Sequence, residues 1–328
     1  MHIPDGFLDG TTAAGTAVIS AGGLGYAVRR AGRFLQDKRI ALTGLVAAFI
    51  FALQMLNFPV AAGTSGHLLG GALAAILVGP WLGMTAVGVV IIVQALIFAD
   101  GGITALGANI LNMAIVTAMV GWILFRLLMR VLPKTWPFAL VATFAASLVS
   151  VVSASILFVI EYAVGGQGAA DIGTVFGAMV GVHFLIGLGE GLISAATIGA
   201  VAAVRPELIA GLEGFNMPAA NRSKVRSGVL GFALTGMAVA AILVFLAPFA
   251  SSQPDGLNRV AIDQGFGDQE QTSATAGSPL AGYGVSGVEE EDNGTRIAGL
   301  VGIGVTFLVG AGIVWGFSAL RRRSASPL

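Results

Sequence analysis

The sequence predicts an all-α, polytopic membrane helical bundle with about nine transmembrane helices, arranged as seven followed by two. Hydrophobic residues make up 56% of the 328 positions and charged residues only 10%, a composition typical of helical membrane proteins. The 48 glycines favour close approach between helices in lipid. The absence of cysteine excludes disulfides, thiolate metal sites and cysteine nucleophiles.

Each predicted helix is an apolar run long enough, at roughly 20 residues, to cross the hydrocarbon core of a bilayer. The third run is the shortest and could instead be re-entrant. In chain order, the nine runs lie near residues 11–28, 40–57, 63–79, 82–99, 105–129, 137–163, 173–203, 227–250 and 298–320.

The basic residues are distributed unevenly between the connections, and this distribution predicts the orientation. Of the 17 Lys and Arg residues, 15 follow the first, fifth, seventh and ninth runs. The positive-inside rule therefore predicts an external N-terminus and a cytoplasmic C-terminus. A re-entrant third run would place three of the 15 outside, so the charge bias favours a full crossing. The 15 are Arg29, Arg30, Arg33, Lys38, Arg39, Arg126, Arg130, Lys134, Arg205, Arg222, Lys224, Arg226, Arg321, Arg322 and Arg323; Arg259 and Arg296 fall on the other side.

The first two residues predict an external metal site. A large second residue favours retention of Met1. The chain then offers three nitrogens that can chelate one metal ion: the Met1 α-amine, the His2 backbone nitrogen and the His2 imidazole. Such donors suit Ni(II), Cu(II), Co(II) and Zn(II). His67 lies on the same predicted face and would complete a four-nitrogen set, which matches the planar geometry of Ni(II) or Cu(II). Alternatively, the start of the chain is disordered and His67 bonds only to a loop carbonyl.

Further polar residues could line a cavity at this face or support the ligands. The connection from Asp100 to Asn109 fits either a loop that dips into a cavity or a simple turn. In the seventh run, His183 and Glu190 share one helical face, and ionisable groups at the bilayer centre cost at least about 2.5–3.5 kcal/mol. His183 and Glu190 either have a functional role or form a hydrogen-bonded pair that stabilises the helix bundle. The supporting candidates are Asp5, Asn57, Ser65, Asp100, Asn109, His183 and Glu190.

Four segments carry a resemblance to a known family: MHIPDGFL, NFPVAAGTSGHLLGGALAAILVGPW, ADGGITALGANILNMA and HFLIGLGEGL. Together they resemble the CbiM/NikM family, the substrate-binding permease subunits of cobalt and nickel energy-coupling factor (ECF) transporters, over residues 1–205. The resemblance implies a seven-helix subunit of the cell membrane. It also implies that the ion is bound by the amine of Met1, the backbone nitrogen and imidazole of His2, and the imidazole of His67.

The same resemblance implies partners and cargo. The partners are a transmembrane coupling subunit (CbiQ/NikQ-like) and cytoplasmic ATP-binding-cassette ATPases (CbiO/NikO-like). The cargo is Ni(II) or Co(II), with no permanently bound cofactor. Membrane lipid surrounds such a subunit, and we expect no nucleic-acid partner.

A second part follows a basic connector at residues 206–226. Residues 227–328 hold two runs around an external segment, 251–297, that contains eight of the 17 acidic residues. On composition alone this segment is a solvated loop. Its start, Gln253-Pro-Asp-Gly-Leu-Asn258, resembles the PDGLE domain of the small accessory subunit (CbiN/NikN-like), which implies a role in loading the ion. The final Glu of that motif is Asn258 here, which puts any role of that carboxylate in doubt.

The chain is not expected to be an enzyme, and two other functions remain as alternatives. None of its three lysines belongs to a G-x-x-x-x-G-K-[ST] phosphate loop, so energy must come from partners or an ion gradient. A proton-coupled secondary transporter would use Glu190 and His183. A rhomboid-like serine protease would use Ser65 of Gly63-Thr-Ser-Gly66 with His183 as base, and no H-E-x-x-H zinc protease motif is present. Imidazole ligands predict that metal affinity falls below about pH 6.5.

Overall fold

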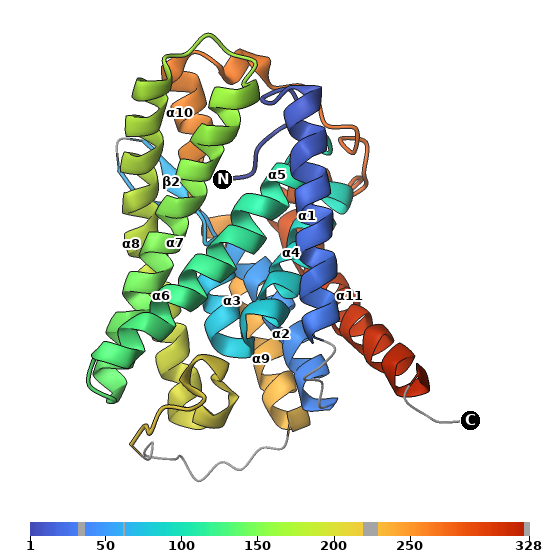
Figure 1. Ribbon diagram of the computed structural model, residues 1–328. Coiled ribbons are helices and arrows are strands. Elements are labelled where there is room, and N and C mark those ends of the chain that lie inside the picture. The colour runs from blue at the N-terminus through green and yellow to red at the C-terminus, as the bar shows by residue number, and fades with distance from the viewer. Residues whose placement is uncertain (32–36, 62, 219–228, 325–328) are drawn as a thin grey trace.

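The computed structural model describes residues 1–31, 37–61, 63–218 and 229–324. It is a bundle of long helices with the N-terminus drawn into its interior (Figure 1). Within these ranges, six helices are long and apolar enough to cross a membrane. The prediction of a polytopic helical membrane protein is therefore confirmed, whereas the count of nine is not. The six are Pro80–Ile97, Leu106–Val131, Trp136–Gly165, Ile172–Val204, Gly231–Phe249 and Glu291–Phe317.

The first two predicted runs form helices that are not among these six. Helix α1 spans Gly10–Ala31, where threonine, serine and glycine are mixed with the apolar residues. Helix α2 spans Asp37–Gln54, and its apolar part is only Ile40–Gln54. At 1.5 Å per residue, that part is about 22 Å long, less than the roughly 30 Å of a bilayer core.

The prediction of a continuous transmembrane helix over residues 63–79 is wrong. The strands β1 (Phe58–Pro59) and β2 (Ser65–Gly66) form an antiparallel pair, and helix α3 covers only Gly71–Val78. Gly70 has φ +84°, a left-handed conformation that glycine adopts easily, and it marks the change from extended chain to helix. Eight residues of helix cover only about 12 Å, so α3 cannot span a membrane alone.

Helix α3 lies at the centre of the bundle (Figure 1), and all of its residues are buried. It packs against α4 (Pro80–Ile97), α6 (Thr117–Val131) and α7 (Trp136–Gly165). Gly71 lies directly against Thr117, where any side chain would overlap the threonine. Glycine therefore allows the close helix contact that membrane bundles use.

The remaining helices of the first part complete the wall around α3. Helix α5 (Leu106–Ile110) continues through a π-helical turn, η1 (Leu111–Val116), into α6. Helix α8 (Ile172–Val204) packs along α7 and begins at Asp171, whose carboxylate accepts a hydrogen bond from Thr174 N at 2.8 Å. The 3₁₀ turns η2 (Pro206–Leu208) and η3 (Ala210–Leu212) follow.

Residues 229–324 add two long helices joined by a folded cover. Helices α9 (Val229–Leu246) and α11 (Glu291–Ser324) both pack against α2, and α11 also contacts α4. Between them, the chain lies over the end of the bundle at which the N-terminus enters (Figure 1). The elements of this cover are η4 (Ala247–Phe249), α10 (Gly256–Gln264), η5 (Gly267–Gln269) and η6 (Ala281–Tyr283).

The expectation of a solvated loop over residues 251–297 is wrong. Leu257 and Phe266 are fully buried, and the ring of Phe266 packs edge-on against Phe7 with centroids 5.3 Å apart. Helix α11 begins at Glu291, seven residues before the predicted run. Acidic and small residues concealed these elements in the sequence because their few buried apolar residues contact the other half of the chain.

The orientation predicted from basic residues stays a prediction. Four of those residues, Arg33, Arg222, Lys224 and Arg226, lie outside the described residues. The connector predicted at 206–226 is likewise described only as far as residue 218.

Glu190→Gln tests how the centre of the bundle is held. The Glu190 carboxylate accepts hydrogen bonds from Leu69 N at 2.6 Å and Gly70 N at 3.0 Å, immediately before α3. The variant should lower the free energy of unfolding by about 1–3 kcal/mol, because one buried N–H loses its acceptor. Thermal unfolding of the purified chain measures this, with the exposed Glu291→Gln as control. Equal unfolding temperatures for the two variants would contradict this role.

Candidate metal site

The first seven residues enter the bundle as a segment that its neighbours hold in place. Met1 is 3% exposed and Ile3 is fully buried. Asn109 clamps Ile3: its Nδ2 donates to Ile3 O at 3.0 Å and its Oδ1 accepts from Ile3 N at 2.7 Å. The Asp5 carboxylate accepts from Thr104 N at 2.7 Å and from Thr104 Oγ1 at 2.6 Å. Met1 and His2 are therefore fixed inside the protein.

The N-terminal amine lies beside His67. Met1 N and His67 Nε2 are 2.6 Å apart, although 66 residues separate them. The other ring nitrogen, Nδ1, lies 3.0 Å from Leu68 O and can donate to it. This bond favours the tautomer with the proton on Nδ1, so the lone pair of Nε2 points to the amine.

His2 stacks on His67, with ring centroids 5.0 Å apart and ring planes 22° apart. Its Nε2 is 3.1 Å from Gln94 Oε1, and its Nδ1 is 3.3 Å from Asp100 Oδ1. Tyr283 joins these partners by donating to Asp100 Oδ2 at 2.5 Å and accepting from Gln94 Nε2 at 3.0 Å. The His2 ring is thus oriented by groups from α4, the following loop and the cover.

The distances suit a nitrogen donor set. Two neighbouring nitrogens of a square-planar ion lie about 2.8 Å apart when each metal–nitrogen bond is about 2.0 Å, close to the separation of Met1 N and His67 Nε2. No hydrogen bond among the described residues uses the His2 backbone N–H as donor. No cluster of three or more His, Cys, Asp and Glu side chains in this part of the chain has the geometry to hold a metal.

Asp255 is the principal site residue that the sequence analysis did not select. Its Oδ2 lies 2.7 Å from Met1 N and 3.8 Å from His67 Nε2. Burial alone would raise the pKa of this carboxyl, but the N-terminal ammonium and His67 outweigh it and hold the pKa well below its usual value. The available signal was the Pro-Asp-Gly motif itself, which the sequence analysis connected only with the accessory domain.

The other predicted candidates have different positions. Asp5 and Asn109 anchor the N-terminal segment, and Asp100 contacts His2. Asn57 contributes its main-chain oxygen, which accepts from Ser251 N at 2.8 Å. None of these four residues contacts the Met1 amine among the described interactions.

Ser65, His183 and Glu190 do not form a catalytic pair or a hydrogen-bonded pair with one another. Ser65 Oγ donates to Gln253 O at 2.7 Å, while His183 Nδ1 lies 2.8 Å from Met179 O and can donate to it. Glu190 binds the main chain before α3. The Ser65–His183 dyad of the protease alternative therefore has no support in the geometry.

A buried pair outside this site was also missed. Asn112 Nδ2 donates to Glu161 Oε2 at 2.7 Å, which joins the π-helical turn to α7. Glu161 is alone among apolar residues in the sequence, and the helical pattern does not show which neighbouring helix it faces.

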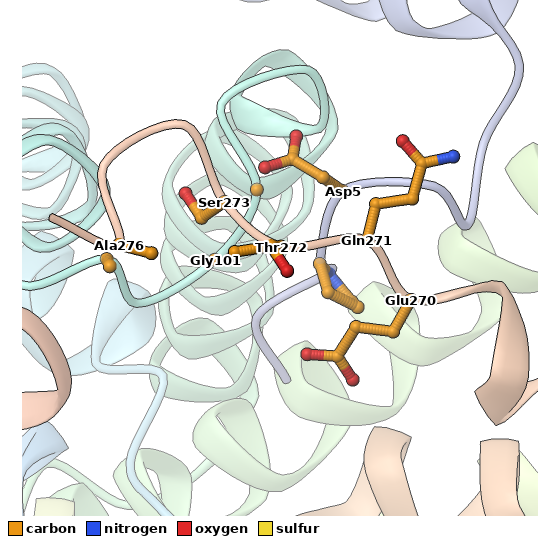
Figure 2. Close-up of a pocket in the computed structure, with 10 residues that line it drawn as sticks. Asp5, Gly101, Glu270, Gln271, Thr272, Ser273 and Ala276 are labelled. Carbon is orange, nitrogen blue, oxygen red and sulfur yellow. The ribbon is translucent and has the colours of Figure 1, made fainter.

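A cavity of about 270 Å³ lies next to the candidate site, between the N-terminal segment, the loop at residues 99–102 and the cover. Figure 2 shows the side chains of Asp5 and Glu270 around it, with Gln271, Thr272 and Ser273 from the cover. Gly101 separates the cavity from His2: a Cβ added at Gly101 would lie 3.4 Å from His2 Cβ. Gly101 therefore lies both on the wall of the cavity and against His2.

Asn109→Ala tests the clamp on the N-terminal segment. Loss of two hydrogen bonds to the buried Ile3 main chain should weaken the anchoring by about 1–3 kcal/mol. The α-amine should consequently react faster with an amine-directed reagent, as measured by mass spectrometry of the N-terminal peptide. Asn293→Ala, at an exposed site, is the control. The same rate in both variants would show that Asn109 does not hold the segment.

The ring of His2 should titrate far below an ordinary imidazole. Burial lowers its pKa to about 4 from 6.5, and the nearby Asp100 carboxylate partly opposes this effect. Asp100→Asn should therefore lower the pKa further. Because the unfolded chain binds this proton near pH 6.5, stability should fall as the pH drops from there towards 4. NMR titration of labelled histidine rings measures the pKa, and a value near 6.5 for His2 would contradict its burial.

Two family descriptions match the chain. Residues 2–208 match the cobalt uptake substrate-specific transmembrane region, and residues 230–319 match the PDGLE domain. The first match covers the four segments of the first part from His2 onward, and the second covers Gln253–Asn258, so the resemblance is confirmed.

Similar proteins include metal transport proteins of archaea. A putative metal transport protein of Haloquadratum walsbyi is 42% identical over 209 residues, which cover 64% of this chain and 93% of that protein. A putative fused nickel transport protein NikMN of Archaeoglobus fulgidus is 43% identical over 209 residues, which cover 64% and 68% of the two chains.

A solved structure is also similar. The crystal structure of a transition metal transporter aligns with a TM-score of 0.56 and 27% identity, covering 61% of this chain and 92% of that chain.

Proposed function

The chain belongs to the family of cobalt uptake substrate-specific transmembrane proteins and carries a PDGLE domain, and we propose that it is the ion-binding component of an ECF-type importer for nickel or cobalt. The ion is bound by Met1 N, the backbone nitrogen and Nδ1 of His2, and Nε2 of His67. The observation that carries this proposal is the 2.6 Å approach of Met1 N to His67 Nε2, with the His2 ring stacked 5.0 Å from that of His67.

Protonation and hydrogen bonding favour this donor set. Burial lowers the pKa of His2 to about 4, so its ring is neutral and retains a lone pair at physiological pH. With Nδ1 on the metal, Nε2–H donates to Gln94 Oε1 at 3.1 Å, as a ligating histidine requires from its second nitrogen. Protons should consequently compete with the metal for the His2 ring nearer pH 4 than pH 6.5.

Transport begins with capture of the cation at the external face. The ion displaces a proton from the α-ammonium and one from the His2 amide, and the four nitrogens replace its water ligands. The loop that carries His67 encloses it. Release to the cytoplasm follows movement of the subunit as partner ATPases cycle. This sequence has no phosphate loop, so the ATPases of the complex are separate, cytoplasmic chains. The coupling subunit is a further chain, in the plasma membrane with this one.

Nitrogen donors in a plane suit Ni(II) well, and they also bind Co(II). Affinity alone does not select between these ions, because the Irving–Williams order places Ni(II) above Co(II) at any nitrogen site. Metal analysis of the chain purified with its native start identifies the ion that it retains.

His2→Ala and His67→Ala should each abolish stoichiometric Ni(II) or Co(II) binding, since each removes at least one of four donors. One residue added before Met1 should have the same effect, because it converts the amine into an amide. His183→Ala, which changes the third histidine, is the matched control and should retain one ion per chain. Metal content after gel filtration measures all four variants. Full binding in the extended chain would refute the donor set and favour a proton-coupled transporter that uses Glu190 and His183.

A further inference from the structure

The cover places one carboxylate beside the proposed donor set. Asp255 Oδ2 lies 2.7 Å from Met1 N and 3.8 Å from His67 Nε2, and the Asp255 side chain is 14% exposed. Met1 and His67 are 3% and 5% exposed. A single oxygen atom from the second part of the chain therefore faces two nitrogens of the first.

This oxygen is held in place through the main chain on either side of it. Ser65 Oγ donates to Gln253 O at 2.7 Å, and Ser65 N donates to Pro254 O at 2.9 Å. Ser65 belongs to β2, two residues before His67. On the other side, Gly256 packs against Ile186 of α8, where a Cβ would lie 2.7 Å from Ile186 Cδ1. Asp255 is thus fixed relative to the strand that leads to His67.

The two carboxylate oxygens of Asp255 make different contacts. Oδ1 accepts from Asn258 N at 2.8 Å and caps α10, whereas Oδ2 faces Met1 N. A carboxylate is not needed for the cap, because asparagine caps helices equally well. Its negative charge is needed only where Oδ2 meets a cation.

We propose that Asp255 is the charge partner of the transported ion, with its Oδ2 paired to the α-ammonium in the ion-free chain and to the divalent cation in the loaded chain. This inference rests on the proposed function. Oδ2 already lies near two of the donor nitrogens. A cation bound to them therefore replaces the α-ammonium as the positive partner of Oδ2 without a movement of the cover. A divalent ion in a site of low dielectric gains most from such a partner. Asp255 therefore slows release of the ion and leaves the four nitrogen donors unchanged.

Asp255→Asn in the full-length chain with its native start tests the proposal. The variant keeps the shape and the helix cap and removes the charge. We expect one Ni(II) per chain with an unchanged absorption spectrum, because the nitrogen donors are intact. Release of Ni(II) into excess chelator should be at least tenfold faster than in the unaltered chain. Asp255→Glu, which restores the charge, should recover part of the slow release.

Asp263→Asn is the matched control, because Asp263 lies on the same helix and pairs with Arg259 at 2.9 Å on the surface. Its release rate should stay within twofold of the unaltered chain. Equal release from Asp255→Asn and Asp263→Asn would overturn the proposal. A changed spectrum or lost stoichiometry in a folded Asp255→Asn chain would also overturn it, since the carboxylate would then act on the donor set itself. If the unaltered chain bound no ion, the proposed function would fail instead.

Discussion

The structure depends on the burial of the N-terminal amine inside a helical membrane protein. A positive charge in a site of low dielectric requires a partner, and Asp255 provides it at 2.7 Å. The amine in turn lies against His67, so the first residue of the chain joins two segments that are 66 and 254 residues away. Any change that moves the amine disturbs both contacts.

Several polar groups inside the bundle hold the N-terminal segment or the chain that follows His67. Asn109 binds the main chain of Ile3, Asp5 binds Thr104, and Glu190 binds the two N–H groups that precede α3. The interruption of the third apolar run has the same effect, because an extended chain presents His67 where a continuous helix would not. Intramembrane polar residues commonly mark function, and here they form a scaffold around the amine.

The second part of the chain adds side chains to the candidate site. Its cover supplies Asp255 to the amine and Tyr283 to the partners of His2, and it forms one wall of the cavity beyond Gly101. Since the cover belongs to the matched PDGLE region and contacts the N-terminal segment of the other matched region, fusion of the two parts keeps its side chains close to the N-terminus. This is a physical advantage of a single chain over two separate subunits.

The sequence by itself determined the helical membrane class and the family, and it selected Met1, His2 and His67 as candidate nitrogen ligands. Hydrophobicity and short motifs are local properties, so they can be read without the fold. The interrupted third run, the folded cover and the involvement of Asp255, Gln94 and Tyr283 depended on tertiary structure. Each of these rests on contacts between residues distant in the chain, and a carboxylate in an acidic segment looks the same in the sequence whether it faces water or a buried ammonium. Only the packing of the cover against the bundle decided which of the eight acidic residues in that segment enters the site.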